Sequence, residues 1–545
     1  MSFEIVNRDL LARIGKFETK SGVVETPLLF PVINPGIQPI PPKTLEQEFS
    51  CTALITNAYI INKNFKEIAV EKGLHEFLDF GGSIMTDSGA YQLLIFKDIE
   101  ITPKEIVQFQ EVIDTDIATI LDIPTGWDVP KEYARYTVKE TLKRAKALKK
   151  MKSRDDLAWV GPVQGGQYFD LVAKSAKEMG KLPFQVHALG SPTPVMEQYK
   201  FDVLVDMIVT AKMNLPPDRP LHLFGAGHPF MFSLAVALGC DLFDSAAYAL
   251  FARQDRYLTD SGTNRLDQMT YFPCSCPVCN KIDPETVRAL PKLERQKLLA
   301  EHNLHVSFAE LRRIKQAITE GRLWEHMEMR AHGHPSLLQA LKRVRKYSEY
   351  MEQHSPITKR SGAFFFTSLG LARPAVIRHR KRLNRYSPPP EAKVLLLLPQ
   401  TRKKPFHTSK EHETVMNEVR QTLGDAIDAV HVCTYAAPFG VIPTELDEVY
   451  PVSQNEVAFP FDHETVMHVA EQVVNYIENT VYERVILLRD PTVWNGKILT
   501  ACRLVCKKKK VPFTASREKD PWAKKTTEHL ASVIREAVIS PQNIV

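Results

Sequence analysis

Short apolar runs alternate with longer amphipathic segments from the start of the chain to about residue 255. The runs are rich in β-branched and aliphatic residues, and the segments between them, such as 130–151 and 201–215, repeat apolar residues at helical spacing. This alternation predicts βα units and a parallel sheet, and eight units fit a (β/α)8 barrel of roughly 250 residues. The eight runs are residues 26–33, 52–59, 82–89, 117–124, 158–166, 184–191, 221–227 and 241–246.

The rest of the chain divides into a helical extension and a second α/β region. Residues 283–352 show the apolar spacing of helices. A basic, proline-containing segment over 351–392 is typical of a linker. From residue 393 to 545, apolar runs such as VLLLLP and RVILLRD again alternate with helical stretches. We therefore expect an α/β protein with a catalytic barrel and its extension over 1–350, the linker, and a C-terminal α/β accessory domain over 393–545.

Polar residues collect where the predicted strands end, which is where barrel enzymes hold their active sites. They include Asp87, Asp122, Gln164, Gly190 and Asp244. Asp87 in MTDSGAYQ and Asp244 in DLFDSAAY are each followed by serine and small residues, so a sugar could approach them closely. Two such acids could divide the cleavage of a glycosidic bond, one attacking the anomeric carbon and the other moving protons. Taken singly, an aspartate before serine is more often a turn or helix-capping residue.

Three cysteines fall within residues 274–279, in a chain that holds only eight. Cys274, Cys276 and Cys279 could bind one ion, with His302 or the neighbouring His305 as a fourth ligand. Sequence spacing does not decide between the two histidines. The alternative is a disulfide or three unoccupied thiols, which a cytosolic setting and the risk of oxidation disfavour. The sequence thus predicts a structural zinc site over about residues 270–305.

Composition supports a folded globular protein: of 545 residues, 44% are hydrophobic and 25% are charged. No apolar run approaches the ~18 residues of a membrane span and no signal peptide is apparent, so we expect a cytoplasmic protein without membrane contact. The net charge of +6 is modest. Basic residues bunch at 378–382, 402–404 and 507–510; such runs can neutralise phosphates, although a solvated face is the commoner reason for them.

Several of these motifs together resemble the archaeal tRNA-guanine transglycosylases. The resemblance runs in order over roughly residues 1–350 and includes MTDSGAYQ, LDIPT, VQGG, HALGS, HLFGAGHP, DLFDSAAYALFARQDRY and FPCSCPVC followed by LLAEHNLH. The combination of TDSG, FDSA and PCSCPVC is highly specific. The resemblance implies an enzyme that exchanges a guanine in the D-loop of tRNA for 7-cyano-7-deazaguanine, on the path to archaeosine, and that pairs as a homodimer around its zinc site.

The resemblance also implies roles for individual residues. Asp244 matches the nucleophile that holds the ribose covalently, and Asp87 matches the general acid/base; the reverse division of these two roles is the alternative. Asp122 matches the carboxylate that reads the base, and its two oxygens suit the N1–H and amine donors of guanine. The implied zinc ligands are Cys274, Cys276, Cys279 and His302, and the implied base pocket comprises Ser88, Gln164, Gly190, Ser191 and Tyr91, the last as a stacking platform.

The second half departs from the usual pattern of the family. We identify no PUA domain, the small RNA-binding barrel that usually ends fused archaeal members. The segment LPQTRKKPFHTSKEH from Leu398 resembles the accessory region shared with archaeosine synthase, in which a similar segment has a cysteine and a reactive lysine. Gln400 stands in place of that cysteine, while Lys403 and Lys404 remain, so an RNA-contacting region is favoured over a second active site. The alternative functions are an archaeosine synthase-like paralogue and a non-catalytic tRNA-binding subunit.

Overall fold

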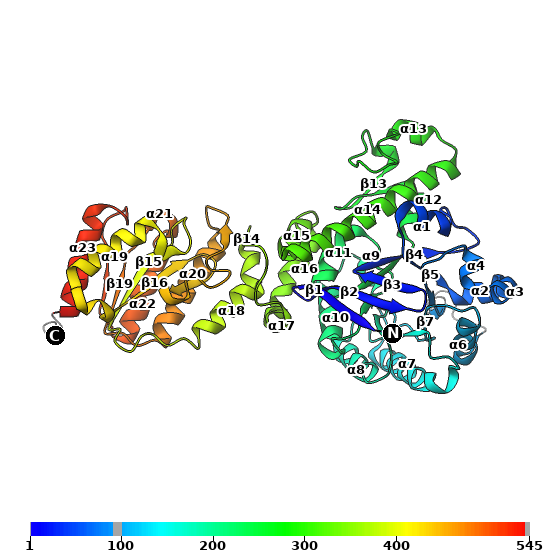
Figure 1. Ribbon diagram of the computed structural model, residues 1–545, viewed down its shortest axis with the longest axis horizontal. Helices are drawn as coiled ribbons and strands as arrows, with labels where there is room; N and C mark the ends of the chain where they lie inside the picture. Colours follow the sequence, from blue (N-terminus) through cyan, green and yellow to red (C-terminus); the bar gives the residue numbers. More distant parts are fainter. Residues whose placement is uncertain (1, 91–100, 540–545) are drawn as a thin grey trace. The chain divides into compact units, whose positions relative to one another are not determined.

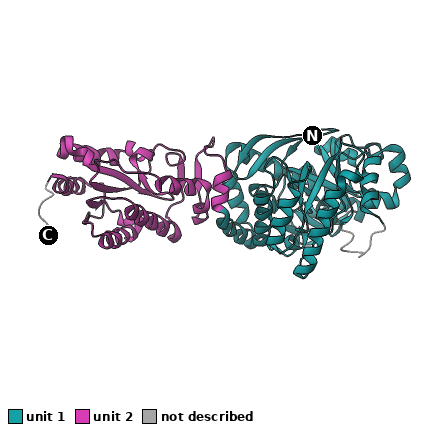
Figure 2. Cartoon of the chain, turned by 90° about the horizontal axis from the view of Figure 1, so that it is seen from below, with its two compact units in different colours: residues 1–347 teal, residues 348–545 magenta. Residues whose placement is uncertain are grey.

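A computed structural model describes residues 2–90 and 101–539. The chain forms two compact units, residues 1–347 and residues 348–545, and each is described by itself (Figure 2). Within the described ranges, no helix is long and apolar enough to cross a membrane.

The predicted barrel is confirmed in unit 1. Eight strands close into a parallel barrel in the order β10-β11-β4-β5-β6-β7-β8-β9, and each lies within one of the predicted runs (Figure 1). Because the strands are parallel, their carboxyl ends open at one rim. The strands are β4 (Leu28–Ile33), β5 (Ala53–Asn57), β6 (Ser83–Asp87), β7 (Ile117–Thr119), β8 (Ala158–Val163), β9 (Val186–Leu189), β10 (Leu221–Leu223) and β11 (Leu242–Ser245).

Alternate strand residues fill the barrel interior, among them Phe30, Met85 and Val160, so it is a packed core rather than a pore. The opposite faces of the strands pack against helices outside. These helices are α1 (Pro42–Phe49), α2 (Ala58–Asn64), α3 (Lys66–Lys72), α4 (Leu74–Leu78), α6 (Pro103–Val112), α7 (Lys131–Met151), α8 (Phe169–Met179), α9 (Thr193–Glu197), α10 (Phe201–Asn214), α11 (Pro229–Ala237) and α12 (Ala247–Arg253).

An antiparallel sheet of β1 (Phe3–Asp9), β2 (Ala12–Thr19) and β3 (Gly22–Thr26) precedes the barrel, and the sequence analysis did not predict it. Along β1, half-buried and exposed residues alternate, so its apolar signal is weak.

The helices predicted after the barrel form. They follow the two-stranded sheet of β12 (Arg256–Leu258) and β13 (Thr263–Arg265), and in unit 1 they are α13 (Pro284–Ala289), α14 (Lys292–Glu320), α15 (Leu323–Ala331) and α16 (Pro335–Val344). The buried carboxylate of Glu310 on α14 accepts two 2.7 Å hydrogen bonds from Arg330 on α15, which fastens these helices together.

Unit 2 is a second α/β fold with a five-stranded sheet in the order β17-β16-β15-β19-β20, parallel except between β16 and β17. All six residues of β15 are buried because helices cover both faces of the sheet. The strands are β15 (Val394–Pro399), β16 (Val430–Ala436), β17 (Gly440–Pro443), β19 (Arg484–Leu487) and β20 (Phe513–Ala515). The helices around it are α19 (Lys410–Leu423), α20 (His463–Asn479), α21 (Pro491–Trp494), α22 (Lys497–Lys509) and α23 (Lys524–Ile539).

The segment 351–392, interpreted from its composition as a linker, contains regular structure. It includes the end of α17 (Ser348–His354), strand β14 (Ala363–Phe365), which pairs with β18 (Asn455–Val457), and α18 (Pro374–Leu383). Its basic residues pair with acids on α17: Arg378 with Glu352, Arg380 with Glu349, and Lys381 with both. The prolines and positive charges that suggested a linker therefore begin a helix and bind it to its neighbour.

Candidate active site and metal centre

Three carboxylates lie at the rim of the barrel. Asp87 is the last residue of β6, Asp122 follows β7, and Asp244 belongs to β11. Burial, together with the negative charges of Asp122 and Asp244, raises the pKa of Asp87 to about 7. Asp122 and Asp244 are thus close enough to Asp87 to affect its ionisation, although the three acids come from separate βα units.

Asn57 holds Asp87 in position from the neighbouring strand. Asn57 of β5 stands opposite Asp87 of β6 in the parallel register, and its Nδ2 donates a 2.9 Å hydrogen bond to Asp87 Oδ2. Gly89 follows with φ 89°, and a Cβ there would come within 2.4 Å of Tyr59. Between them, the buried hydroxyl of Ser88 has no hydrogen-bond partner among the described atoms. The turn therefore leaves a polar group beside Asp87 that a ligand could satisfy.

Asp122 and Gln164 form a second, buried part of the rim. Gln164 Nε2 donates a 2.5 Å bond to Asp122 Oδ2, and Gln164 Oε1 accepts from the Thr125 backbone N–H at 2.9 Å and from Ser191 Oγ at 3.2 Å. A Cβ at Gly190 would lie 2.2 Å from Gln164 Nε2, so a larger residue would displace the amide. Burial raises the pKa of Asp122 to about 6. The pair forms a fixed polar wall that can accept donors from a planar base.

Asp244 is held through one of its oxygens. Its Oδ1 accepts a hydrogen bond from the Gly225 backbone N–H at 2.9 Å and lies 2.9 Å from His222 Nε2. Asp244 Oδ2 bonds no described atom, and 14% of the side chain is exposed. This geometry keeps one carboxylate oxygen available at the rim.

His222 is a site residue that the sequence analysis missed. It is fully buried on β10 and stacks on Phe30 at 5.8 Å between ring centroids. Its Nδ1 is buried without a hydrogen-bond partner in the described part of the chain, so Nε2 is the ring nitrogen that makes a hydrogen bond, and it faces Asp244. The sequence did contain a sign of this role, because His222 is a polar residue between two leucines of an apolar strand.

Of the remaining predicted pocket residues, Ser88, Gln164, Gly190 and Ser191 gather around these acids as described above. Tyr91, predicted as a stacking platform, lies outside the described residues.

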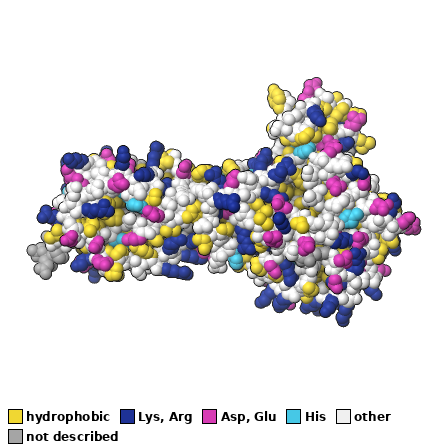
Figure 3. Space-filling view, viewed as in Figure 1, with side chains coloured by type: hydrophobic (Ala, Val, Ile, Leu, Met, Phe, Trp, Pro, Cys, Tyr) yellow, Lys and Arg dark blue, Asp and Glu magenta, His cyan; other side chains and the backbone are white. Residues whose placement is uncertain are grey.

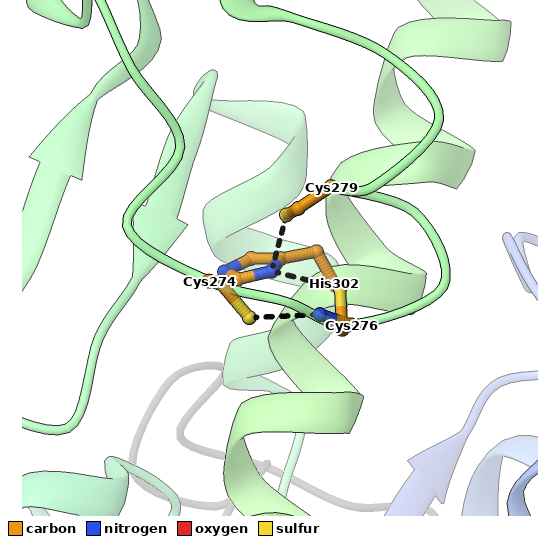
Figure 4. A group of neighbouring side chains, drawn as sticks. All are labelled: Cys274, Cys276, Cys279 and His302. Atoms are coloured by element: carbon orange, nitrogen blue, oxygen red, sulfur yellow. Dashed lines mark hydrogen bonds between the residues drawn. The ribbon is translucent and has the colours of Figure 1, made fainter.

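The cysteine cluster folds into a compact metal-binding geometry. The Sγ atoms of Cys274, Cys276 and Cys279 and one ring nitrogen of His302 all lie within 4.8 Å of one another (Figure 4). His302 Nδ1 lies 3.3 Å from Cys279 Sγ and 3.5 Å from Cys276 Sγ. Four ligand atoms converging in this way suit one tetrahedral ion.

The chain itself orients the histidine ligand. His302 Nε2 lies 2.9 Å from the Leu258 carbonyl oxygen, and donation to it leaves the Nδ1 lone pair directed at the thiols. Tyr257 stacks on the imidazole at 3.6 Å. His305, the competing candidate, instead stacks on Phe49 at 4.5 Å and is not part of the cluster. The structure thereby selects His302.

Residues of the predicted basic runs have partners within unit 2. Lys and Arg side chains are interspersed with Asp and Glu on the visible face of each unit (Figure 3). Lys509 donates to the carbonyls of Ile477 and Thr480 at the end of α20, and Lys404 donates to the Asn455 carbonyl. Gln400 Oε1 accepts from the Ala437 N–H at 2.7 Å, so this side chain serves the local fold.

Fold and site together define a (β/α)8-barrel enzyme with an acidic rim and an appended Cys3His cluster that could hold a metal ion. Residues 9–336 match the model of the family described as queuine tRNA-ribosyltransferase, and residues 376–534 match a domain of unknown function (DUF5591). The chain belongs to the queuine tRNA-ribosyltransferase family and is an enzyme of the glycosyltransferase type.

Relatives with the same printed name support this assignment. A tRNA-guanine(15) transglycosylase of Methanocaldococcus jannaschii is 44% identical over 502 residues, which is 89% of this chain and 73% of that protein. The corresponding protein of Methanosarcina mazei is 44% identical over 85% of this chain and 89% of its own length. That of Methanosphaera stadtmanae is 42% identical over 90% of this chain and 72% of its own.

Proposed function

We propose that this protein exchanges guanine 15 of tRNA for 7-cyano-7-deazaguanine through a covalent link between Asp244 and the ribose. The family and the printed names of the relatives support a tRNA-guanine exchange at this position. The observation that carries the chemistry is the set of three carboxylates at the rim of one barrel, where the charges of Asp122 and Asp244 act on Asp87. Because tRNA is a cytoplasmic substrate, we expect the reaction to take place in the cytoplasm.

Asp244 is suited to the nucleophilic role. Its Oδ1 is held by Gly225 and His222, so Oδ2 can attack C1′ of the ribose. As the bond from Oδ2 to C1′ forms, the glycosidic bond breaks and its electron pair leaves with the guanine. In the second half, N9 of the incoming base attacks C1′ and Asp244 leaves as a carboxylate. The phosphodiester chain is not cut.

Asp87 is suited to moving the proton in both halves. With its pKa raised to about 7, it can hold a proton near neutral pH and release it readily. In the first half it gives that proton to the departing guanine. In the second half it takes the N9 proton of 7-cyano-7-deazaguanine, which returns the site to its starting state. The environments of the two acids support this division of roles over the reverse one.

Asp122 and Gln164 are suited to reading the base. Guanine and its deaza analogue both present N1–H and an exocyclic amine along one edge, and an ionised carboxylate accepts both donors. The amide of Gln164 fixes Asp122 Oδ2, so the base would be held in a set plane. The buried Ser88 hydroxyl, beside Asp87, offers a further hydrogen bond to the base.

We propose zinc as the ion of the Cys3His cluster, because three thiolates and one imidazole are the donor set that structural zinc prefers. Cys274, Cys276, Cys279 and His302 would hold it, without a part in the exchange. The bound ion would fasten the loop after β13 to helix α14. The homodimer that the resemblance implies stays a prediction, which light scattering of the full chain would test.

No observation specifically favours either alternative function, the archaeosine synthase-like enzyme or the non-catalytic tRNA-binding subunit. An archaeosine synthase-like enzyme would have no need of Asp87 and Asp244, yet both are present and are held by neighbouring strands. A tRNA-binding subunit without activity would be expected to lack them.

The exchange is tested with tRNA that carries radiolabelled guanine at position 15. We expect the full chain to release the label when 7-cyano-7-deazaguanine is supplied, without cleaving the RNA. A tRNA that is bound but keeps its label under these conditions would refute the proposed function.

A further inference from the structure

The loop between β9 and α10 ends in an exposed aromatic residue with unusual backbone geometry. Tyr199 has φ 55°, a left-handed conformation that is uncommon for a bulky residue. Its side chain is 46% exposed. Strained residues persist only where the surrounding structure fixes them, and they concentrate at functional sites. The conformation and exposure of Tyr199 therefore indicate a function other than joining β9 to α10.

Neighbouring rings fix the orientation of Tyr199. Its ring stacks on His334 with centroids 5.1 Å apart and an interplanar angle of 12°, and Phe201 meets it edge to face at 5.9 Å. His334 is itself fixed, because its Nδ1 accepts the Ser336 backbone N–H at 3.2 Å as the cap of α16. A rigid, flat and exposed ring costs little conformational entropy when it binds another flat group.

The same loop adjoins the acidic rim. It begins at Gly190 and Ser191, which adjoin Gln164, and a Cβ at Gly225 would lie 2.6 Å from Thr193 Oγ1 at the start of α9. The Gly225 N–H is one of the two groups that hold Asp244. The residue after Tyr199, Lys200, places its ammonium 5.2 Å from the ring centroid of Trp127, so a cation lies on this part of the rim.

We propose that Tyr199, backed by His334, is a stacking platform for a nucleobase that flanks the exchanged guanine. Removing a base from a folded tRNA loop unstacks its neighbours, and aromatic side chains are the usual partners of unstacked bases in RNA recognition. Lys200 supplies positive charge for the adjoining phosphate. This inference rests on the proposed tRNA substrate and deepens it by assigning a contact outside the base-exchange pocket.

Binding of tRNA to the full-length protein tests the platform independently of the exchange. We expect Tyr199→Ala to weaken tRNA binding about 10-fold, within the range of a base–aromatic stack, and Tyr199→Phe and Tyr199→Trp to bind within about twofold of wild type. The control of matched exposure is Tyr133→Ala, which removes a tyrosine of 45% exposure from the first turn of α7 and should leave tRNA binding unchanged. Unfolding temperatures establish that each variant is folded.

A transcript that lacks one base identifies the partner. When the nucleotide beside guanine 15 that stacks on Tyr199 is made abasic, we expect the wild-type protein to bind the tRNA about 10-fold more weakly. The Tyr199→Ala variant should bind this abasic tRNA as tightly as the wild type binds it. Three results would each overturn the platform: unchanged binding by Tyr199→Ala, an equal loss in Tyr133→Ala, or an equal loss in Tyr199→Phe. If the wild type binds tRNA with these dependences but releases no labelled guanine, the proposed exchange fails while the platform stands.

Discussion

Among single residues, the carboxylates of Asp87 and Asp244 are held in different ways by their neighbours. Asp87 accepts a hydrogen bond from Asn57 and feels the charges of the other two acids, whereas Asp244 accepts from a backbone N–H and faces the buried ring of His222. One environment favours a carboxyl group that keeps its proton near neutral pH. The other fixes one carboxylate oxygen by hydrogen bonds and leaves the second available.

The raised pKa of Asp87 has a consequence for stability. The folded protein binds this proton more tightly than the unfolded chain, whose aspartates titrate near pH 4, so the contribution of Asp87 to stability declines as the pH rises from about 4 to about 7. Asp87→Asn removes this loss. We expect its melting temperature to exceed that of wild type by about 2 °C or more at pH 8, with a smaller difference at pH 5. A variant less stable than wild type at pH 8 would contradict the raised pKa.

His222 should position Asp244 rather than bind substrate. We expect His222→Phe, which keeps an aromatic ring but removes the donor, to slow guanine release in a single turnover by about 10- to 100-fold while tRNA affinity stays within about twofold. His222→Gln, which can place a donor near the same point, should recover part of the rate.

The control for His222 is His187→Phe. His187 is a buried histidine on the adjacent strand β9, between Val186 and Ala188, which face the barrel interior, so its own ring points outward. If His187→Phe and His222→Phe slowed guanine release equally, the loss would reflect damage to the barrel core in general. His222 would then have no specific role in positioning Asp244.

At the scale of helices and strands, periodicity predicted most of the fold. Short apolar runs predicted all eight barrel strands, and most residues of these strands are buried in the structure. Strand β1 escaped prediction because only one side of it is shielded, and β14 and β18 because each has only three residues. Basic composition suggested a linker where α18 forms, because composition does not reveal that Glu349 and Glu352 pair with its charges.

The sequence could place the acids at strand ends, but it could not supply their partners. The bond between Asn57 and Asp87 depends on the register of two strands 30 residues apart in the chain. The contact between His222 and Asp244 requires two strands to lie side by side with matching side-chain directions. Similarly, spacing along the helix could not show whether His302 or His305 is the fourth ligand. In the structure, His305 stacks on Phe49 and is not part of the cysteine cluster.

The metal cluster should stabilise the helical extension. We expect His302→Ala to lose one bound zinc per chain, measured by elemental analysis of the purified protein, and to unfold at a temperature lower by several degrees, since a structural zinc contributes directly to folding. His305→Ala is the matched control and should keep its zinc. Zinc retained by His302→Ala and lost from His305→Ala would reverse the ligand assignment.

At the scale of the whole molecule, the chain joins a family barrel to a second α/β unit that matches a domain of unknown function. The chemistry proposed here lies entirely in unit 1. RNA contact by unit 2 stays a prediction, and residues of all three of its basic runs already have partners within the unit, at Glu349 and Glu352, at Asn455 and at the end of α20.

The most direct test of the central claim is mass spectrometry of the full chain mixed with tRNA and quenched under denaturing conditions. We predict a covalent adduct whose RNA remnant maps to the peptide that contains Asp244. Asp244→Asn, which can still accept the bonds from Gly225 and His222, should bind tRNA but give neither adduct nor guanine release. An adduct on Asp87, or continued exchange by Asp244→Asn, would contradict the account.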